Sequence, residues 1–208
     1  MPSILFWVGA LVVLTMLGKF SRVIIASIWG KDIGGKALAQ QPDQIHLVRT
    51  ETDRRKNAAT ALGLVDALKG RGFKDAGIHE IPEMPGVTVQ LLAQFDEGFY
   101  AAIYDHPAAG CWFDIVTRYQ DGTASTFTTA RATGLKPRPG FPVVNAPGTS
   151  APDLLARARR ERPRSPFKSA SVETVARDFA DAYADQMSWR KNQGISTGEV
   201  VDVARRAA

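Results

Sequence analysis

Apolar and polar residues alternate over several short stretches in the middle of the chain, a pattern typical of strands with one buried face. The expected strands cover residues 45–49, 77–81, 87–94, 98–104, 111–119 and 125–130. Short connections separate the last four, and Asp121-Gly122 is a typical hairpin turn, so we expect these strands to pair in sequence. The pattern predicts an antiparallel meander of about four to six strands.

Apolar residues at helical spacing flank the expected sheet. One helix is expected to begin after Thr50 or Thr52 and to run to Lys69, with its apolar stripe at Ala58, Ala61, Leu62, Val65 and Leu68. Three more helices are expected over 151–161, 172–191 and 195–206. A sheet with a preceding helix and a helical C-terminal region belongs to the α+β class.

Two local signals refine this outline. Ser196 and Glu199 stand three residues apart at the start of the last expected helix, which is the spacing of a capping box. Residues 134–150 contain four prolines within a short distance and show no periodic pattern. We expect this segment to run over the surface of the sheet as a long loop.

The N-terminus contains the most apolar segment of the chain, with no charged side chain before Lys19. Eighteen helical residues span about 27 Å, close to the ~30 Å hydrocarbon core of a bilayer. Residues 1–29 are therefore expected to form a transmembrane anchor that continues as an interfacial helix. A buried core helix is disfavoured because no face is polar. A cleavable signal peptide is disfavoured because no basic side chain precedes the run.

Charge near this segment predicts the orientation. Lys19, Arg22, Lys31 and Lys36 follow the apolar run, so the positive-inside rule places the N-terminus outside and the C-terminal part in the cytoplasm. The expected organisation is a single-pass membrane protein that binds the bilayer through residues 1–29. A linker over 30–44 and a cytoplasmic domain over 45–208 follow, with a helical extension over about 151–208.

Residues Gly30 to Lys36 spell G-x-x-x-x-G-K, the skeleton of a phosphate-binding loop. Ala37 stands where such a loop needs a Ser or Thr hydroxyl, and no strand is expected before it. Nucleotide binding is therefore disfavoured.

Composition narrows the function classes. The chain has 208 residues, of which 45% are hydrophobic and 23% are charged, as in ordinary globular proteins. Its single cysteine excludes an intrachain disulfide framework and a thiolate zinc finger, and suits a reducing compartment. No cofactor and no metal site is expected.

The net charge of +5 is distributed unevenly. Residues 71–110 hold six acidic and two basic side chains, whereas a basic cluster follows at Arg157, Arg159, Arg160, Arg162, Arg164 and Lys168. These six residues are the candidate binding site for anionic lipid headgroups or a protein partner. Nucleic acid is disfavoured because no aromatic residues interleave with the arginines. The alternative is a solvated helix face that is balanced by acidic residues of this or another subunit.

Two further clusters carry candidate chemistry. Asp105, His106, Cys111 and Asp114 include the parts of a nucleophilic site, although a cysteine that starts an apolar strand is more often a small core residue. Aromatic residues on the expected strands are candidates for a ligand cup or for plain core packing: Phe99, Tyr100, Trp112, Phe113, Tyr119 and Phe127.

The leading functional prediction is a membrane-tethered, non-enzymatic interaction module, either a scaffold or an accessory subunit of a membrane-associated complex. The alternative is a small-ligand or lipid-binding domain that uses the aromatic face of the sheet. The third hypothesis is an enzyme centred on His106 and Cys111. A carrier needs an internal cavity, whereas an enzyme needs polar groups that converge near Cys111.

Overall fold

The computed structural model describes residues 29–206, which form two compact units. The larger unit comprises residues 42–131 and 137–188. The smaller unit comprises the described parts of three segments, residues 29–41, 132–136 and 189–206.

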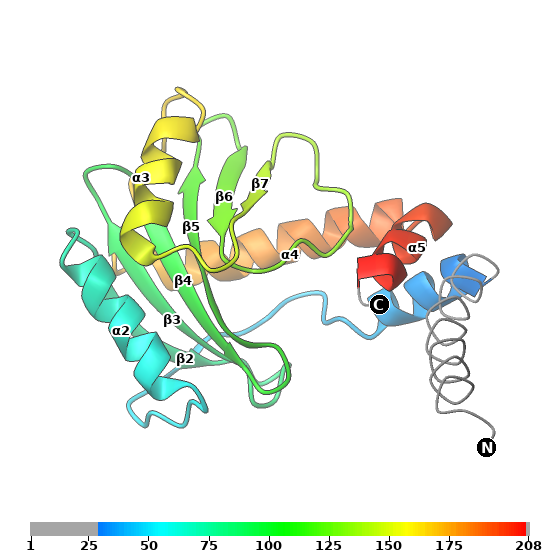
Figure 1. The fold of residues 1–208 in the computed structure, drawn as a ribbon, viewed down its shortest axis with the longest axis horizontal. Coiled ribbons are helices and arrows are strands. Elements are labelled where there is room, and N and C mark those ends of the chain that lie inside the picture. Colours follow the sequence, from blue (N-terminus) through cyan, green and yellow to red (C-terminus); the bar gives the residue numbers. More distant parts are fainter. Residues whose placement is uncertain (1–28, 207–208) are drawn as a thin grey trace, which may run out of the picture. The chain divides into compact units, whose positions relative to one another are not determined.

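A seven-stranded sheet forms the larger unit (Figure 1). Its strands lie side by side in the order of the sequence, β1(Val48–Thr50), β2(Lys74–Glu80), β3(Thr88–Gln94), β4(Phe99–His106), β5(Gly110–Arg118), β6(Ala124–Thr128) and β7(Val143–Asn145). The first six strands pair antiparallel, and β7 pairs parallel to β6.

The predicted fold was wrong in the size and type of this sheet, which is mixed and has seven strands. The expectation of a four- to six-stranded antiparallel meander did not include β7. This strand has three residues and lies between Pro142 and Pro147, so it is too short for an alternating pattern to be recognised. The chain reaches β7 by a long connection, as a parallel pairing requires.

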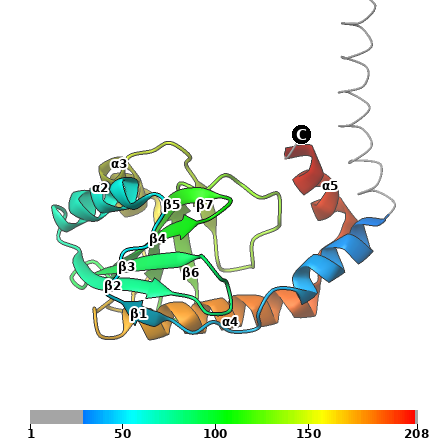
Figure 2. The same cartoon turned by 90° about the horizontal axis from the view of Figure 1, so that it is seen from below.

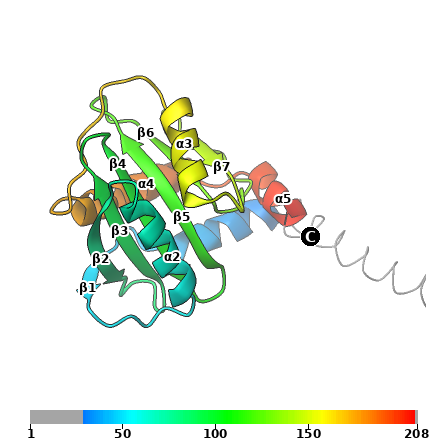
Figure 3. The same ribbon diagram turned by 60° about the vertical axis from the view of Figure 1, so that its left-hand side comes forward.

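Helices cover both faces of the sheet (Figure 2). One face carries α2(Ala58–Lys69) and α3(Ala151–Glu161), which contact each other across it (Figure 3). The opposite face carries the first part of α4(Val175–Gln193). Neighbouring strand residues point to opposite faces, so β4 sends Phe99 and Ile103 to the first core and Tyr100 to the second. Strand β3 lies in the middle and is buried along its whole length.

The transmembrane helix expected in this fold is contradicted. Within residues 29–206 no helix is both long enough and apolar enough to cross a membrane. The longest, α4, has 19 residues, but six of them are charged. The predicted span over residues 1–18 and the interfacial continuation up to residue 28 lie outside the described residues. The features "single-pass" and "signal anchor" are corrected on the same ground, since no helix within residues 29–206 supports them. Residues 29–39, most of them in the expected linker, are helical.

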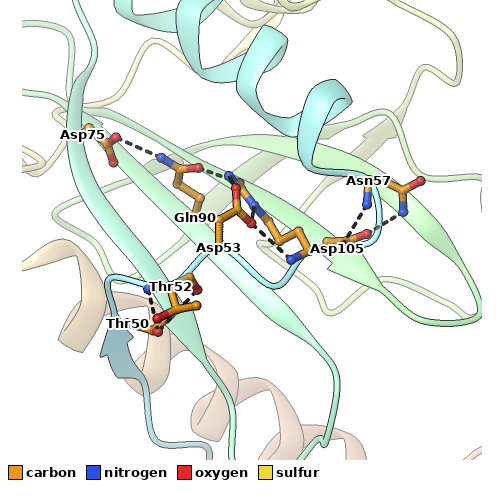
Figure 4. A network of polar contacts seen from close by, with 8 residues as sticks. Thr50, Thr52, Asp53, Asn57, Asp75, Gln90 and Asp105 are labelled. Atoms are coloured by element: carbon orange, nitrogen blue, oxygen red, sulfur yellow. Dashed lines mark hydrogen bonds and ion pairs between the residues drawn. The ribbon is translucent and has the colours of Figure 1, made fainter.

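Helix α2 begins at Ala58, later than Thr50 or Thr52, because the preceding residues are bound to the sheet by a polar network (Figure 4). The buried guanidinium of Arg55 donates to Gln90 Oε1 at 2.6 Å and to both carboxylate oxygens of Asp53 at 2.7 and 2.8 Å. Gln90 in turn donates to Asp75 at 2.8 Å. Asn57 donates from its side chain to Asp105 at 2.6 Å. These contacts hold the chain in a non-helical form until α2 starts.

Gly98 in the turn between β3 and β4 is a position where only glycine fits. Its φ is +64°, and a Cβ atom there would overlap the Phe167 ring and lie 2.8 Å from the Lys168 carbonyl oxygen. We expect Gly98→Ala to lower the free energy of unfolding by about 2 to 3 kcal/mol, from left-handed strain and the overlap together. Gly122→Ala is the control, since φ is +86° but no atom lies within 4 Å of the added carbon. Equal losses in urea denaturation of the two variants would show that the overlap has no effect.

Candidate functional site

A cavity of about 360 Å³ lies in the larger unit, on the sheet face that α4 covers. We call it the sheet cavity. Its walls come from strands β4 to β7, from the irregular segment around Arg138 and Phe141, and from residues 179–187 of α4. The volume lies within the range of small-molecule sites in proteins.

The floor of the sheet cavity is built by cross-strand neighbours. Tyr100 pairs with Val116, Val116 with Thr126, and Thr126 with Val143, so one row of side chains crosses four strands. The next row towards one end contains Asp114 and Thr128. Tyr104 lies beyond it and stacks on Trp112 with ring centres 4.8 Å apart. Phe179 and Tyr183 on α4 complete an aromatic wall.

Asp114 is the unusual residue of this lining. Its Oδ1 atom is buried and has no hydrogen-bond partner among the residues that the structure describes. Burial raises the pKa of the carboxyl group to about 6, against the opposing effect of hydrogen bonds with Thr128 and Tyr104. Burial, together with the charge of Asp114, also raises the pKa of the Tyr104 hydroxyl well above its ordinary value. The pocket therefore contains a carboxylate that is incompletely satisfied near neutral pH.

The other end of the sheet cavity is basic. Arg118 lies four residues further along β5 on the same face, about 13 Å from Asp114 along the strand. Its Nη1 atom donates to the Asp178 carbonyl oxygen at 3.1 Å and lies 3.4 Å from the Asp178 carboxylate. Arg138 lies over the Phe141 ring at 4.2 Å and donates to the Asp185 carbonyl oxygen at 3.4 Å. The cavity thus has an acidic end at Asp114, an aromatic and apolar middle, and an end that holds two arginines, with Asp185 beside Arg138.

Asp114 is expected to destabilise the folded protein when ionised. Its folded-state pKa of about 6 exceeds the ordinary 3.8, so the folded state favours the protonated form. The protonated Asp114 carboxyl group therefore contributes fully to stability below pH 4, and this contribution is lost as pH rises through 6. We expect Asp114→Asn to raise the free energy of unfolding by about 2 to 3 kcal/mol at pH 8 and to change it little at pH 4.

Urea denaturation at the two pH values measures this difference. Asp96→Asn on an exposed turn is the control for the change in net charge, and should have little effect at either pH. A destabilised Asp114→Asn protein at pH 8 would contradict the description of this carboxylate.

The six predicted basic residues lie on α3 and in the segment after it, and they do not line the sheet cavity. Several of them contact acidic groups of the same chain. Arg159 donates to Glu97 at 2.7 Å, and Arg157 and Arg160 pair with Glu161 at 2.9 and 2.7 Å. The first of these pairs also lowers the pKa of the Glu97 carboxyl through hydrogen bonding.

The other three residues of the basic cluster differ from one another in how far they are exposed to solvent. Arg162 donates to the Glu97 carbonyl oxygen at 2.6 Å and stacks over Phe99 and Phe167. Arg164 and Lys168 are exposed. Binding of headgroups or of a protein partner by this cluster stays a prediction.

The proposed nucleophilic cluster is not brought together. Asp105 and Cys111 face α2 and α3, whereas His106 and Asp114 lie on the opposite face of the same hairpin. His106 Nδ1 accepts hydrogen bonds from the backbone of Ala108 and Ala109, which fixes the turn. Burial raises the pKa of the Cys111 thiol, which disfavours the reactive thiolate.

The predicted aromatic cup is divided between the two faces. Phe99, Phe113 and Phe127 belong to the core under α2 and α3. Tyr119 is buried with its hydroxyl 2.9 Å from Ser125 Oγ. Of the six aromatic candidates, Tyr100 is the one that lines the sheet cavity.

Sequence analysis missed the other parts of the site. The sequence did not assign Phe179, Tyr183 or Phe141 to a binding site. The alternation of side chains along strands could have placed Tyr100, Tyr104 and Asp114 on one face of the sheet. It could not show which side chains face a cavity. No group of three metal-ligating side chains occurs within residues 29–206, so no residue is assigned to a metal.

The smaller unit contains a second cavity, of about 620 Å³, beside the start of α5(Thr197–Arg206). Its buried charges satisfy each other, because Arg190 donates to Glu199 Oε1 at 3.0 Å. Ser196 and Glu199 form the expected capping box, with the Glu199 amide 3.3 Å from Ser196 Oγ and the Ser196 amide 3.0 Å from Glu199 Oε2. Burial raises the pKa of Glu199, but hydrogen bonds from Ser196, Lys136 and Arg190 outweigh it and lower the value to about 2. The two buried charges of this cavity, Arg190 and Glu199, are therefore partnered within the chain.

The chemistry that the sheet cavity can support is inferred from its geometry alone. Comparison with known proteins gives no similarity to draw on, since no protein-family model, no curated protein and no solved structure matches this chain.

Proposed function

We propose that this protein is a small-ligand binding module and that the sheet cavity is its binding site. The observation that carries the proposal is the Asp114 carboxyl group, which lines a cavity with aromatic walls and keeps a buried Oδ1 atom without a hydrogen-bond partner among the described residues. Buried polar atoms are nearly always hydrogen-bonded, so this exception beside a cavity marks Asp114 as a carboxyl group that the described residues do not fully satisfy. A strongly perturbed carboxyl in a cleft supports the same interpretation.

The lining supports binding rather than plain packing. Ligand sites combine apolar and aromatic walls with a few polar groups that orient the ligand. Tyr100, Tyr104 and Phe179 supply the walls, and Asp114 and Arg138 supply polar groups at opposite ends. The residues that would be needed for nucleophilic catalysis, His106 and Cys111, lie on opposite faces of the hairpin.

A fluorescence titration with N-phenylnaphthylamine, a neutral aromatic probe, tests the proposal. We expect the probe to bind the wild-type protein with a 1:1 stoichiometry and with enhanced emission. Ala182 on α4 lines the cavity, so Ala182→Trp should fill it and weaken probe binding at least about tenfold, a loss of about 1.4 kcal/mol. Ala184 lies on the same helix but does not line the cavity, so Ala184→Trp should bind as the wild type does. No saturable binding, or equal binding by the two tryptophan variants, would overturn the proposal.

A further inference from the structure

The acidic end of the sheet cavity restricts the charge of its ligand, provided that the proposed binding function holds. Beside Asp114, the titratable and charged residues of the lining are Tyr100, Tyr104, Arg118, Arg138, Tyr183 and Asp185. The tyrosines are neutral near pH 7. Arg118 is engaged by Asp178 and lies about 13 Å away along β5. No salt bridge to Asp114 occurs within the described part of the chain, so its negative charge has no cationic partner there.

The aromatic residues around Asp114, like its negative charge, favour a cationic group on the ligand. Tyr104 lies beyond Asp114 on the sheet, its ring centre 6.1 Å from that of Phe179, and Tyr100 and Tyr183 line the same cavity. The faces of aromatic rings carry negative electrostatic potential and attract cations, including ammonium groups of ligands. An anionic group at this end would lie beside the carboxylate and be repelled by it. A neutral group could hydrogen-bond to Asp114 but would leave its charge uncompensated.

We infer that the ligand of the sheet cavity is an organic amine, with a cationic ammonium group bound to Asp114 and an apolar or aromatic body along the row from Tyr100 to Val143. The ammonium donates to the Asp114 carboxylate, which lines the cavity, and supplies the positive charge that this carboxylate lacks within the described part of the chain. Charge-assisted hydrogen bonds of this kind are roughly twice as strong as neutral ones. The size of the cavity, about 360 Å³, suits a small molecule rather than a peptide chain.

Three probes of similar shape and different charge test the inference by isothermal titration calorimetry at pH 8. These are phenethylamine, phenylethanol and phenylpropionate, which carry a cationic, a neutral and an anionic group on the same body. We expect phenethylamine to bind at least about tenfold more tightly than either of the others. In Asp114→Asn, the amine should lose this advantage and bind like the alcohol. At pH 5 the wild-type protein should also lose most of it, because the pKa of Asp114 is about 6.

The outcomes separate this inference from the proposed function. If N-phenylnaphthylamine binds but phenethylamine binds no better than phenylethanol, the amine class is wrong and the binding function stands. If the amine is preferred equally by wild type and Asp114→Asn, the assignment of Asp114 is wrong. If neither the neutral probe nor any of the three compounds binds, the binding function itself is overturned. Ala182→Trp should weaken binding of all three at least about tenfold, and Ala184→Trp should leave it unchanged.

Discussion

Replacing Glu199 with glutamine is expected to destabilise the smaller unit by about 3 to 5 kcal/mol, because it removes one partner of a buried ion pair. The side chains of Arg190 and Glu199 are only 9% and 6% exposed. Glutamine can keep some of the hydrogen bonds from Ser196 and Lys136, but it leaves the Arg190 guanidinium without a carboxylate. An uncompensated buried charge is among the largest single destabilising effects in proteins.

Hydrogen exchange of the α5 backbone amides measures this effect locally, and Asp202→Asn is the control. Asp202 pairs with Arg205 in an exposed position, so its loss should change exchange little. The wild-type protein should show a matching pH dependence. Because the folded-state pKa of Glu199 is about 2 and the ordinary value is 4.5, its stabilisation is present above pH 4.5 and is lost as pH falls towards 2. Similar exchange in the two variants would contradict the importance of the buried pair.

Replacing Arg55 with alanine is expected to lower the free energy of unfolding of the larger unit by about 3 kcal/mol. The Arg55 side chain is 1% exposed, and its loss leaves Gln90 Oε1 buried without the donor that it has at 2.6 Å. It also releases Asp53, whose pKa is lowered chiefly by its hydrogen bond with Arg55. The segment before α2 would then be held to the sheet mainly through Asn57 and Asp105.

Arg54→Ala is the matched control for this change. Arg54 is the adjacent residue, has the same side chain and is exposed, so its loss should cost less than about 0.5 kcal/mol. Urea denaturation followed by circular dichroism compares the two variants. Midpoints lowered equally by both substitutions, or by neither, would show that the polar network of Figure 4 does not stabilise the fold.

Much of the fold could be predicted from local patterns in the sequence. Alternation located the strands from β2 to β6 because each has enough residues to show it, and helical spacing with the Ser196–Glu199 capping box located α5. Strand β7 could not be found, because its pairing with β6 is a long-range contact of three residues. The late start of α2 follows from the bond between Arg55 and Gln90, which are 35 residues apart. No local pattern contains such information.

The site was harder to predict than the fold. Sequence analysis grouped Asp114 with Cys111 and His106 because they are close in the chain, although Asp114 and Cys111 lie on opposite faces of β5. Tyr104 and Thr128 hydrogen-bond to Asp114, and the aromatic residues of α4 that line the same cavity lie more than 60 residues further along the chain. Nothing in the sequence shows that Asp114 keeps an oxygen without a partner. That property depends on how closely α4 and the irregular segment approach the sheet.

The central claim is that the Asp114 carboxylate in the sheet cavity binds a cationic ligand. The pKa of Asp114 tests this claim most directly. A nuclear magnetic resonance titration of the side-chain carboxyl carbon, assigned with Asp114→Asn, measures this pKa in the free protein and in the presence of saturating phenethylamine. The account predicts about 6 in the free protein and a clear decrease when the amine is bound, because a cation favours the ionised form. A value near 4 in the free protein that does not change with the amine would contradict it.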